Sequence, residues 1–356
     1  MNAWQELAAN AVEPNIFYEP WSLLPAWQEF PNHRVRVAFV FGHDRRLIAV
    51  FPLISGRGYR QIPVTTLSLW RHLHCPLCTP LVLAGREYEA LTAFFGWMRS
   101  NPFGASLFLF DHITADGPFS GQLDRALVTA RRRSYEHERW ERAMIRPAGD
   151  PEQYLERALA SKRRRELRRQ SNRLSEQGDL TCVELTPGDH LTPWLDDFLA
   201  LEQAGWKGRD GTAIASRDTE RHYFERVAGA AFERGQLMML ALKLDGRPIA
   251  MKCNFLDRDG GYAAKIAYDE SFASYSPGVQ LELHHLRLLH TRPHIRWMDS
   301  CAVPNHFMKE RLWTERRPMR TVLISTGGLL GNTIVSALPL AEGAWRRLKR
   351  AQAASD

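Results

Sequence analysis

A segment in the second half of the chain constrains the fold most, because it alternates short apolar runs with strong turn signals. Three runs rich in β-forming residues, Gln236–Leu244, Ile249–Phe255 and Gly261–Tyr268, are separated by Asp245-Gly246 and by residues 257–261. Asp-Gly between such runs is a hairpin signal, since the turn needs residues that tolerate positive φ. The segment therefore predicts a three-stranded antiparallel meander.

A helix and a further strand are expected after the meander. The run Val279–His290 has an apolar helical face, and Pro277 and Gly278 lie at its entrance. That face carries Val279, Leu283, Leu286 and Leu289 at helical spacing. The run His294–Asp299 has the composition of a strand. The predicted order is thus β-β-β-loop-α-β.

The first half of the chain repeats this order. Strands are expected over Arg34–Phe41 and Leu47–Ile54, a helix near Glu87–Arg99, and another strand over Ser106–Asp111. Both halves therefore predict a hairpin that is followed by a helix and a strand.

The two hairpins also share a short sequence pattern. Asp-x-Arg-x-Ile-Ala begins at Asp44, with Leu47 between the arginine and the isoleucine, and again at Asp245. Each copy later ends in two apolar residues and an acid, at Asp111 and at Asp299. A match this short can arise by coincidence, but tandem copies of one fold explain both matches.

The length and one composition shift suggest two domains. The 356 residues exceed the usual single domain of roughly 100 to 200 residues. The Pro/Gly-rich stretch at residues 147–151 is the expected boundary. The predicted fold class is α/β (α+β), with each domain a mixed, mostly antiparallel sheet flanked by helices. The domains are expected over 1–147 and 148–343, followed by a basic tail over 344–356.

Composition indicates a folded protein with reduced thiols. Hydrophobic residues make up 44% of the chain, which excludes a disordered class. The N-terminus lacks a basic leader followed by an apolar run, so a cytoplasmic location is expected. Five cysteines, an odd number, fit thiols better than disulfides.

One short segment contains residue types that bind metals: His72, His74, Cys75 and Cys78. Their close spacing favours a buried loop, and no metal is expected.

Positive charge is concentrated in one place. The net charge is +7, and Lys162–Arg173 holds seven basic residues and one acid. Three explanations stay open: a solvated helix face, a contact with the phosphates of coenzyme A or with acyl carrier protein, and RNA binding. RNA is ranked last, because no aromatic platform accompanies the charge.

One uncharged stretch bears on membranes. Val322–Leu340 contains no charged residue and is followed by a basic segment at residues 344–350. Glycines, hydroxyls and Pro339 weaken it as a spanning helix. A final strand and loop is the preferred interpretation, with peripheral membrane contact as the alternative.

The second half resembles the GNAT-type acyltransferase domain of bacterial exopolysaccharide and cellulose biosynthesis proteins, within the FemAB-like group of tandem GNAT folds. The resemblance covers about 150 residues, and the order of the motifs carries it rather than any single one. The matching residues are Lys162–Arg169, Leu201-Glu202, Trp206-Lys207-Gly208, Gly211–Ile214, the Asp245 hairpin, Tyr262, Tyr268-Asp269, Ser276-Pro277-Gly278 and Asp299. The opening Pro14–Trp21 resembles the entry segment of these proteins.

Two departures from the family pattern concern the donor and the site. The usual Gly-rich pyrophosphate loop is replaced by Ser276-Pro277-Gly278 before Val279, so coenzyme A as donor is an inference. After Asp299, the usual short Gly-containing loop ending in Tyr-Lys is replaced by a segment that carries Cys301 and His306. Residue roles from Tyr-Lys members therefore do not transfer directly.

The resemblance implies an acyltransferase site in the second half. Acyl transfer needs a deprotonated amine, an aligned thioester and donors for the oxyanion. The candidate proton acceptors are Asp299, His306, Glu202 and Asp269, with Asp299 and His306 favoured as a pair. Each has a purely structural alternative, such as capping or ion pairing. The expected donor-binding residues are Ser276, Pro277, Gly278 and Val279, and the expected substrate-binding residues are Trp206, Lys207, Tyr268 and Trp313.

The expected function is N-acyl transfer from acyl-CoA, acetyl-CoA or acyl carrier protein to an amine. The acceptor is a lipid, a sugar or an amino acid of bacterial envelope or polysaccharide metabolism, and no tightly bound cofactor is expected. Two alternatives are kept: a non-catalytic binding partner in envelope assembly, and a FemAB-like transferase that uses aminoacyl-tRNA.

Overall fold

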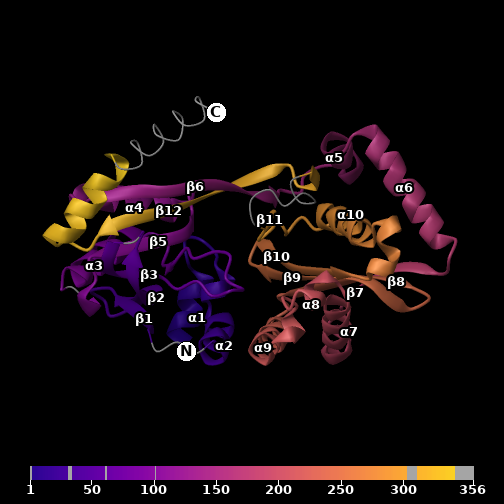
Figure 1. Cartoon of the computed structure of the whole chain (residues 1–356), viewed down its shortest axis with the longest axis horizontal. Helices are drawn as coiled ribbons and strands as arrows, with labels where there is room; N and C mark the ends of the chain where they lie inside the picture. Colours follow the sequence, from indigo (N-terminus) through magenta and orange to yellow (C-terminus); the bar gives the residue numbers. More distant parts are fainter. Residues whose placement is uncertain (1, 31–33, 61, 101, 303–310, 341–356) are drawn as a thin grey trace, which may run out of the picture. The chain divides into compact units, whose positions relative to one another are not determined.

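The computed structural model describes residues 2–30, 34–60, 62–100, 102–302 and 311–340. It contains two compact units (Figure 1). Of the described residues, those within 2–23, 34–140 and 318–340 form the first unit, and those within 24–30 and 141–317 form the second.

The second unit is built on the predicted meander. Strands β8 (Leu237–Leu244), β9 (Arg247–Asp257) and β10 (Gly260–Tyr268) pair antiparallel in sequence order. The β8–β9 turn has positive φ at Asp245 (49°) and Gly246 (78°), as a tight hairpin requires. The three predicted strands are therefore confirmed.

A crossover helix completes the predicted order of the second unit. Helix α10 (Pro277–His290) lies on one face of the sheet and leads to β11 (Trp297–Asp299), which pairs parallel with β10. Leu286 and Leu289, on the predicted apolar face of α10, are fully buried in the core of the second unit. The opposite face is covered by α7 (Leu191–Ala204) and α9 (Asp218–Glu233) (Figure 1).

The remaining elements of the second unit flank this sheet. Helices α5 (Pro151–Ala158) and α6 (Ser161–Ser175) precede β7 (Leu180–Glu184), which pairs with β8. The short helix α8 (Trp206–Arg209) and the 3-10 turn η3 (Ile214–Ser216) lie between α7 and α9. A second 3-10 turn, η4 (Glu270–Tyr275), connects β10 to α10.

The first unit has the same order of elements. Its meander consists of β1 (Val35–Phe41), β2 (Leu47–Tyr59) and β3 (Ile62–Leu69). Helix α3 (Glu87–Arg99) then leads to β5 (Leu107–Thr114), which pairs parallel with β3 as β11 does with β10. This repetition confirms two copies of one fold. The short strand β4 (Leu81–Val82) pairs with β2, and the unit also contains α1 (Asn2–Ala9), most of β6 (Ser134–Ile145) and α4 (Pro118–Thr129).

The C-terminal strand departs from the predicted domain limits of 1–147 and 148–343. Strand β12 (Glu315–Ser325) pairs antiparallel with β5, from Met319 opposite Thr114 to Ser325 opposite Leu107. These backbone hydrogen bonds place residues 318–340 in the first unit. The end of β6, by contrast, belongs to the second unit, where Met144 and Ile145 pair with β11.

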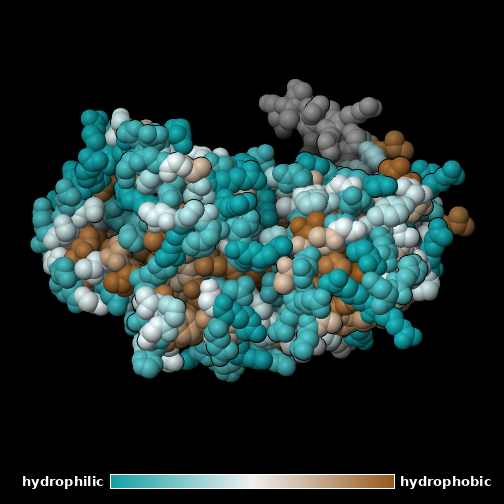
Figure 2. Space-filling model, turned by 180° about the vertical axis from the view of Figure 1, so that it is seen from behind, coloured by the Kyte–Doolittle hydropathy of each residue, from teal (hydrophilic) through white to brown (hydrophobic). Residues whose placement is uncertain are grey.

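The uncharged stretch Val322–Leu340 forms the end of β12 and a helical segment at residues 329–340, where a loop was expected. Within the described residues, no helix is both long and apolar enough to cross a membrane. Hydrophilic residues predominate on the face shown in Figure 2. The predicted basic tail at 344–356 lies outside the described residues.

Candidate active site

Strand β10 changes its pairing partway along its length. It pairs with β9 from Gly260 to Tyr268, with a bulge between Ala263 and Lys265. It pairs with β11 only from Gly260 to Tyr262. Beyond Tyr262, no strand in the described part of the chain pairs with this edge of β10. Backbone N–H and C=O groups there need other partners, so the edge is available to a bound substrate.

The start of α10 lies close to the end of β10. Ser276 has a left-handed conformation (φ 53°) before Pro277 begins the helix. Gly278 lies against Tyr268, since an added Cβ would be 3.3 Å from the tyrosine ring. The predicted donor-binding residues, Ser276 to Val279, therefore form the first turn of a helix, where N–H groups and the helix dipole favour an anion.

Few backbone donors are left at this helix start. Pro277 has no N–H, and the N–H groups of Val279 and Gln280 donate to the Ser276 carbonyl at 2.9 and 3.0 Å. Among the described residues, the Gly278 N–H donates to no acceptor. One N–H group is much less than the several that a Gly-rich loop offers to a diphosphate.

Four of the predicted residues line one small cavity of about 30 Å³: Glu202, Trp206, Lys207 and Tyr268. Glu202 is buried and accepts hydrogen bonds from Lys207 Nζ at 2.7 Å and from the Ile214 N–H at 2.8 Å. Lys207 Nζ also donates to the Ile266 carbonyl at 3.4 Å, on β10. The structure therefore connects the Glu202–Lys207 pair to the strand whose edge is open.

Lys265 lies beside this pair, at the β10 bulge. Burial lowers the pKa of Lys265, and the nearby Glu202 carboxylate opposes that shift. Glu202 is thus close to two lysines.

Asp269 acts as the cap of a turn. Its carboxylate accepts hydrogen bonds from the Ser271 N–H at 3.0 Å and Oγ at 2.6 Å, and from Arg247 at 2.6 Å. The next residue, Glu270, accepts from the Trp206 N–H at 2.8 Å and from Arg209 at 2.7 Å. These bonds fix η4 and α8 next to the cavity, and a proton-accepting role for Asp269 stays a prediction.

Asp299 is fully buried between two arginines. Its Oδ2 accepts hydrogen bonds from Arg317 at 2.8 Å and Arg142 at 3.3 Å, and its Oδ1 accepts from the Cys301 N–H at 2.7 Å. Burial alone would raise the pKa of Asp299, but Arg142 and Arg317 outweigh it and hold that pKa below its usual value. A carboxylate held in this way is a weak proton acceptor. Its predicted partner, His306, lies outside the described residues.

The structure reveals a second polar cluster that the sequence analysis missed. Lys252 on β9 and Glu282 and His285 on α10 are fully buried. Lys252 Nζ lies 2.5 Å from Glu282 Oε2 and 2.9 Å from His285 Nδ1. Trp313, predicted to bind substrate, is fully buried here, and its Nε1 donates to Glu282 at 2.9 Å.

A sequence signal for this cluster was present. Lys252 interrupts an otherwise apolar run, and Glu282 and His285 are three residues apart on a helix with an apolar face. Burial lowers the pKa of Lys252, while Glu282 and, more weakly, Cys301 oppose that shift. Cys301 is therefore close enough to affect the pKa of Lys252. Cys301 lies two residues after Asp299 in the chain.

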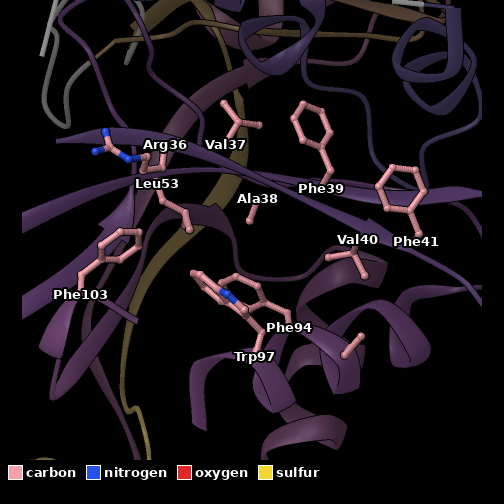
Figure 3. Close-up of a pocket in the computed structure, with 11 residues that line it drawn as sticks. Arg36, Val37, Ala38, Phe39, Val40, Phe41, Leu53, Phe94, Trp97 and Phe103 are labelled. Carbon is pink, nitrogen blue, oxygen red and sulfur yellow. The ribbon is translucent and has the colours of Figure 1, made fainter. Parts of the chain in front are cut away.

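The first unit contains a mainly apolar hollow and a mostly buried segment, His72–Cys78. A hollow of about 490 Å³ between β1 and α3 is lined mainly by apolar side chains, including Ala38, Val40, Phe94 and Trp97 (Figure 3). The His72–Cys78 segment is mostly buried, and burial lowers the pKa of His72 to about 3. Within the described residues, no group of three or more His, Cys, Asp or Glu side chains is placed to hold a metal ion.

Comparisons with known proteins agree with this architecture. The acetyltransferase (GNAT) domain profile matches residues 161–307. The crystal structure of FemX superposes with a TM-score of 0.59 and 11% identity, covering 95% of this chain and 97% of that one. No curated protein matches the chain in sequence.

Two further structures have the same fold. The C-terminal domain of a putative lysylphosphatidylglycerol synthetase from Agrobacterium fabrum has a TM-score of 0.54 and 12% identity, covering 95% of both chains. The structure of L-PGS from Bacillus licheniformis has a TM-score of 0.50 and 12% identity, covering 93% of this chain and 99% of that one. The chain therefore has the FemAB-like tandem GNAT fold. Residues 161–307 are the part of the chain that the acetyltransferase (GNAT) domain model matches.

Proposed function

We propose that the chain is an N-acyltransferase whose active site lies along the open edge of β10. One observation carries this proposal: β10 and β11 stop pairing at Tyr262, and the open edge leads towards the first turn of α10. An extended thioester arm can hydrogen-bond to such an edge while its anionic end lies at a helix start.

The proposed reaction needs no covalent enzyme intermediate. The amine nitrogen attacks the thioester carbonyl, a C–N bond forms, and the C–S bond breaks. The amine loses one proton to a base, and the departing thiolate takes up one proton. Backbone N–H groups on the β10 edge are the proposed donors to the oxyanion.

The proposed residues divide by position. Glu202 and Lys207 line the cavity beside β10, and we assign them to the amine acceptor. Asp299 accepts a hydrogen bond from the Cys301 N–H. We keep His306, which lies outside the described residues, as the proposed proton acceptor. Trp206, half-exposed, and Tyr268 flank the same cavity as proposed substrate contacts.

The proposed acceptor is an amine on a lipid, a sugar or an amino acid of the bacterial envelope. The fold shared with the C-terminal domain of a putative lysylphosphatidylglycerol synthetase supports a lipid among these, since that name describes an aminoacylated lipid. A cytoplasmic location with peripheral contact at the inner membrane is part of this proposal.

Mass spectrometry of acylation reactions tests the proposal. The purified chain is incubated with one of three donors, acyl-CoA, acyl carrier protein thioester or aminoacyl-tRNA, and with a panel of sphingoid bases, amino sugars and amino acids. An amide product is expected, with a large loss of product for Glu202→Gln, Lys207→Met and His306→Ala. Arg221→Gln is the matched control, because Arg221 pairs with Glu225 on the exposed face of α9.

Two outcomes contradict this function. If no donor yields an amide, the alternative of a non-catalytic binding partner is supported. The ion pairs of Glu202, Asp269 and Asp299 are consistent with that alternative. If product forms only with aminoacyl-tRNA, the second alternative, a FemAB-like transferase, is supported. The fold shared with FemX is consistent with that alternative.

A further inference from the structure

Helix α6 presents an exposed basic face. Lys162, Arg163, Arg165, Arg168 and Arg173 are exposed, and none of them has an ion pair within the described part of the chain. Two further arginines of the helix are neutralised, by Glu156 and by Glu166. Five cations on one helix repel one another, so this face favours an anionic partner.

The opposite face fixes α6 to the candidate site. Leu167 and Leu174 are buried in the core of the second unit. Gln170 Nε2 donates to the Ser274 carbonyl of η4 at 3.1 Å, and Gln280 Nε2 on α10 donates to the Leu167 carbonyl at 2.8 Å. The basic face is therefore held next to the first turn of α10.

We propose that this face docks an acidic carrier protein that delivers the acyl group as a thioester on a phosphopantetheine arm. The inference rests on the proposed function and specifies its donor. A phosphopantetheine arm is joined to its carrier through one phosphodiester, whereas coenzyme A has a diphosphate and a third phosphate. The single N–H left at Gly278 suits one phosphate better than a diphosphate cradle.

The extent of the basic face agrees with a protein partner. Lys162 and Arg173 are eleven positions apart on the helix, which corresponds to a rise of about 16 Å. That length fits an acidic helix lying alongside α6. Residues 161–175 contain no aromatic side chain on which a nucleic-acid base could stack. Charge complementarity along a helix therefore favours an acidic protein over RNA.

Binding measurements with charge-reversed variants test the docking. Arg165→Glu/Arg168→Glu/Arg173→Glu reverses the basic face. Arg57→Glu/Arg125→Glu/Arg133→Glu makes the same change in net charge on exposed arginines of the first unit. Holo-acyl carrier protein, bulk tRNA and vesicles containing phosphatidylglycerol are the probes, with coenzyme A measured alongside. Circular dichroism and thermal unfolding verify the fold, and the triple Arg→Gln variant of α6 replaces the Glu variant if helix stability falls.

The expected result is holo-carrier binding that weakens at least about tenfold in the α6 variant, stays within twofold in the control, and falls with added salt. Coenzyme A affinity should not change. Carrier binding that is equal in both variants overturns the proposal, as does a preference of α6 for tRNA or vesicles over the carrier. Binding is read without turnover, so a chain that docks the carrier but forms no amide contradicts the proposed reaction and not the docking.

Discussion

Lys252 Nζ lies 2.5 Å from Glu282 Oε2, and both side chains are excluded from solvent. The pair joins the centre of the β-meander to the second turn of the crossover helix α10. A buried ion pair contributes little to net stability when it is complete, but the loss of one partner leaves an uncompensated charge. The pair therefore links α10 to β9 through a contact that is costly to break on one side only.

Lys252→Met should destabilise the chain by about 3–5 kcal/mol, because Glu282 is left charged and buried. The free energy of unfolding in urea is the measurement. The double variant Lys252→Met/Glu282→Leu should recover much of the loss, since no buried charge remains. Arg221→Ala, which breaks an exposed helix pair, should change stability by less than about 1 kcal/mol. Additive losses in the double variant would falsify the coupling.

Asp299→Asn should also destabilise the chain by about 3–5 kcal/mol, because Arg142 and Arg317 lose the charge that they share. A loss of activity in this variant therefore reports on catalysis only where the protein is shown to be folded. Arg317→Lys should cost less, since a cation remains. Chemical unfolding of the three proteins side by side measures the difference, and equal stability of wild type and Asp299→Asn would contradict the structural role.

The same ion pairs give Asp299 a predictable pH dependence. Its folded-state pKa lies below that of the unfolded chain, so it stabilises the fold fully above the usual aspartate pKa of about 3.9. This contribution is lost as the pH falls through the lower folded pKa. Wild type should lose stability in this acid range more steeply than Asp299→Asn, and parallel pH curves would count against it.

Gly278→Val should weaken donor binding more than it weakens the fold. Its added side chain meets the Tyr268 ring, which a Cβ alone would approach to 3.3 Å at the start of α10. Gly229→Ala is the matched control, because a Cβ at this α9 glycine meets no atom within 4 Å. That control should stabilise the helix by about 0.5–1 kcal/mol. Titration calorimetry measures the donor affinity of Gly278→Val and of the Gly229→Ala control. Unchanged donor affinity in Gly278→Val would show that the donor binds elsewhere.

The local elements of the fold could be predicted from the sequence, because their signals are local. The Asp245-Gly246 turn and the leucines of α10 identified the meander and its helix. The pairing of β12 with β5 could not be predicted in this way, since it joins residues about 200 positions apart through backbone groups that carry no sequence signature.

The candidate site shows the same division. Glu202, Trp206, Lys207 and Tyr268 line one cavity, and the roles expected for them stay predictions. The Lys252–Glu282 pair was missed, because a lysine in an apolar strand and a glutamate on a distant helix carry no sequence signal that they contact each other. Only the packing of α10 on β9 brings the two together in the core.

Asp257 should give the stability of the chain a pH dependence of opposite sign to that from Asp299. It is buried at the end of β9, and burial raises its pKa to about 6, although Arg258 opposes this. Between about pH 4 and pH 6 the folded chain binds more protons than the unfolded one, so stability falls as the pH rises through this window. At pH 7 the charged carboxylate costs about 2–3 kcal/mol. Asp257→Asn should therefore stabilise the chain at pH 7 and have little effect near pH 4. Unfolding free energies at both pH values measure this, and destabilisation at pH 7 would show that the Asp257 carboxylate is charged and well paired in the folded chain.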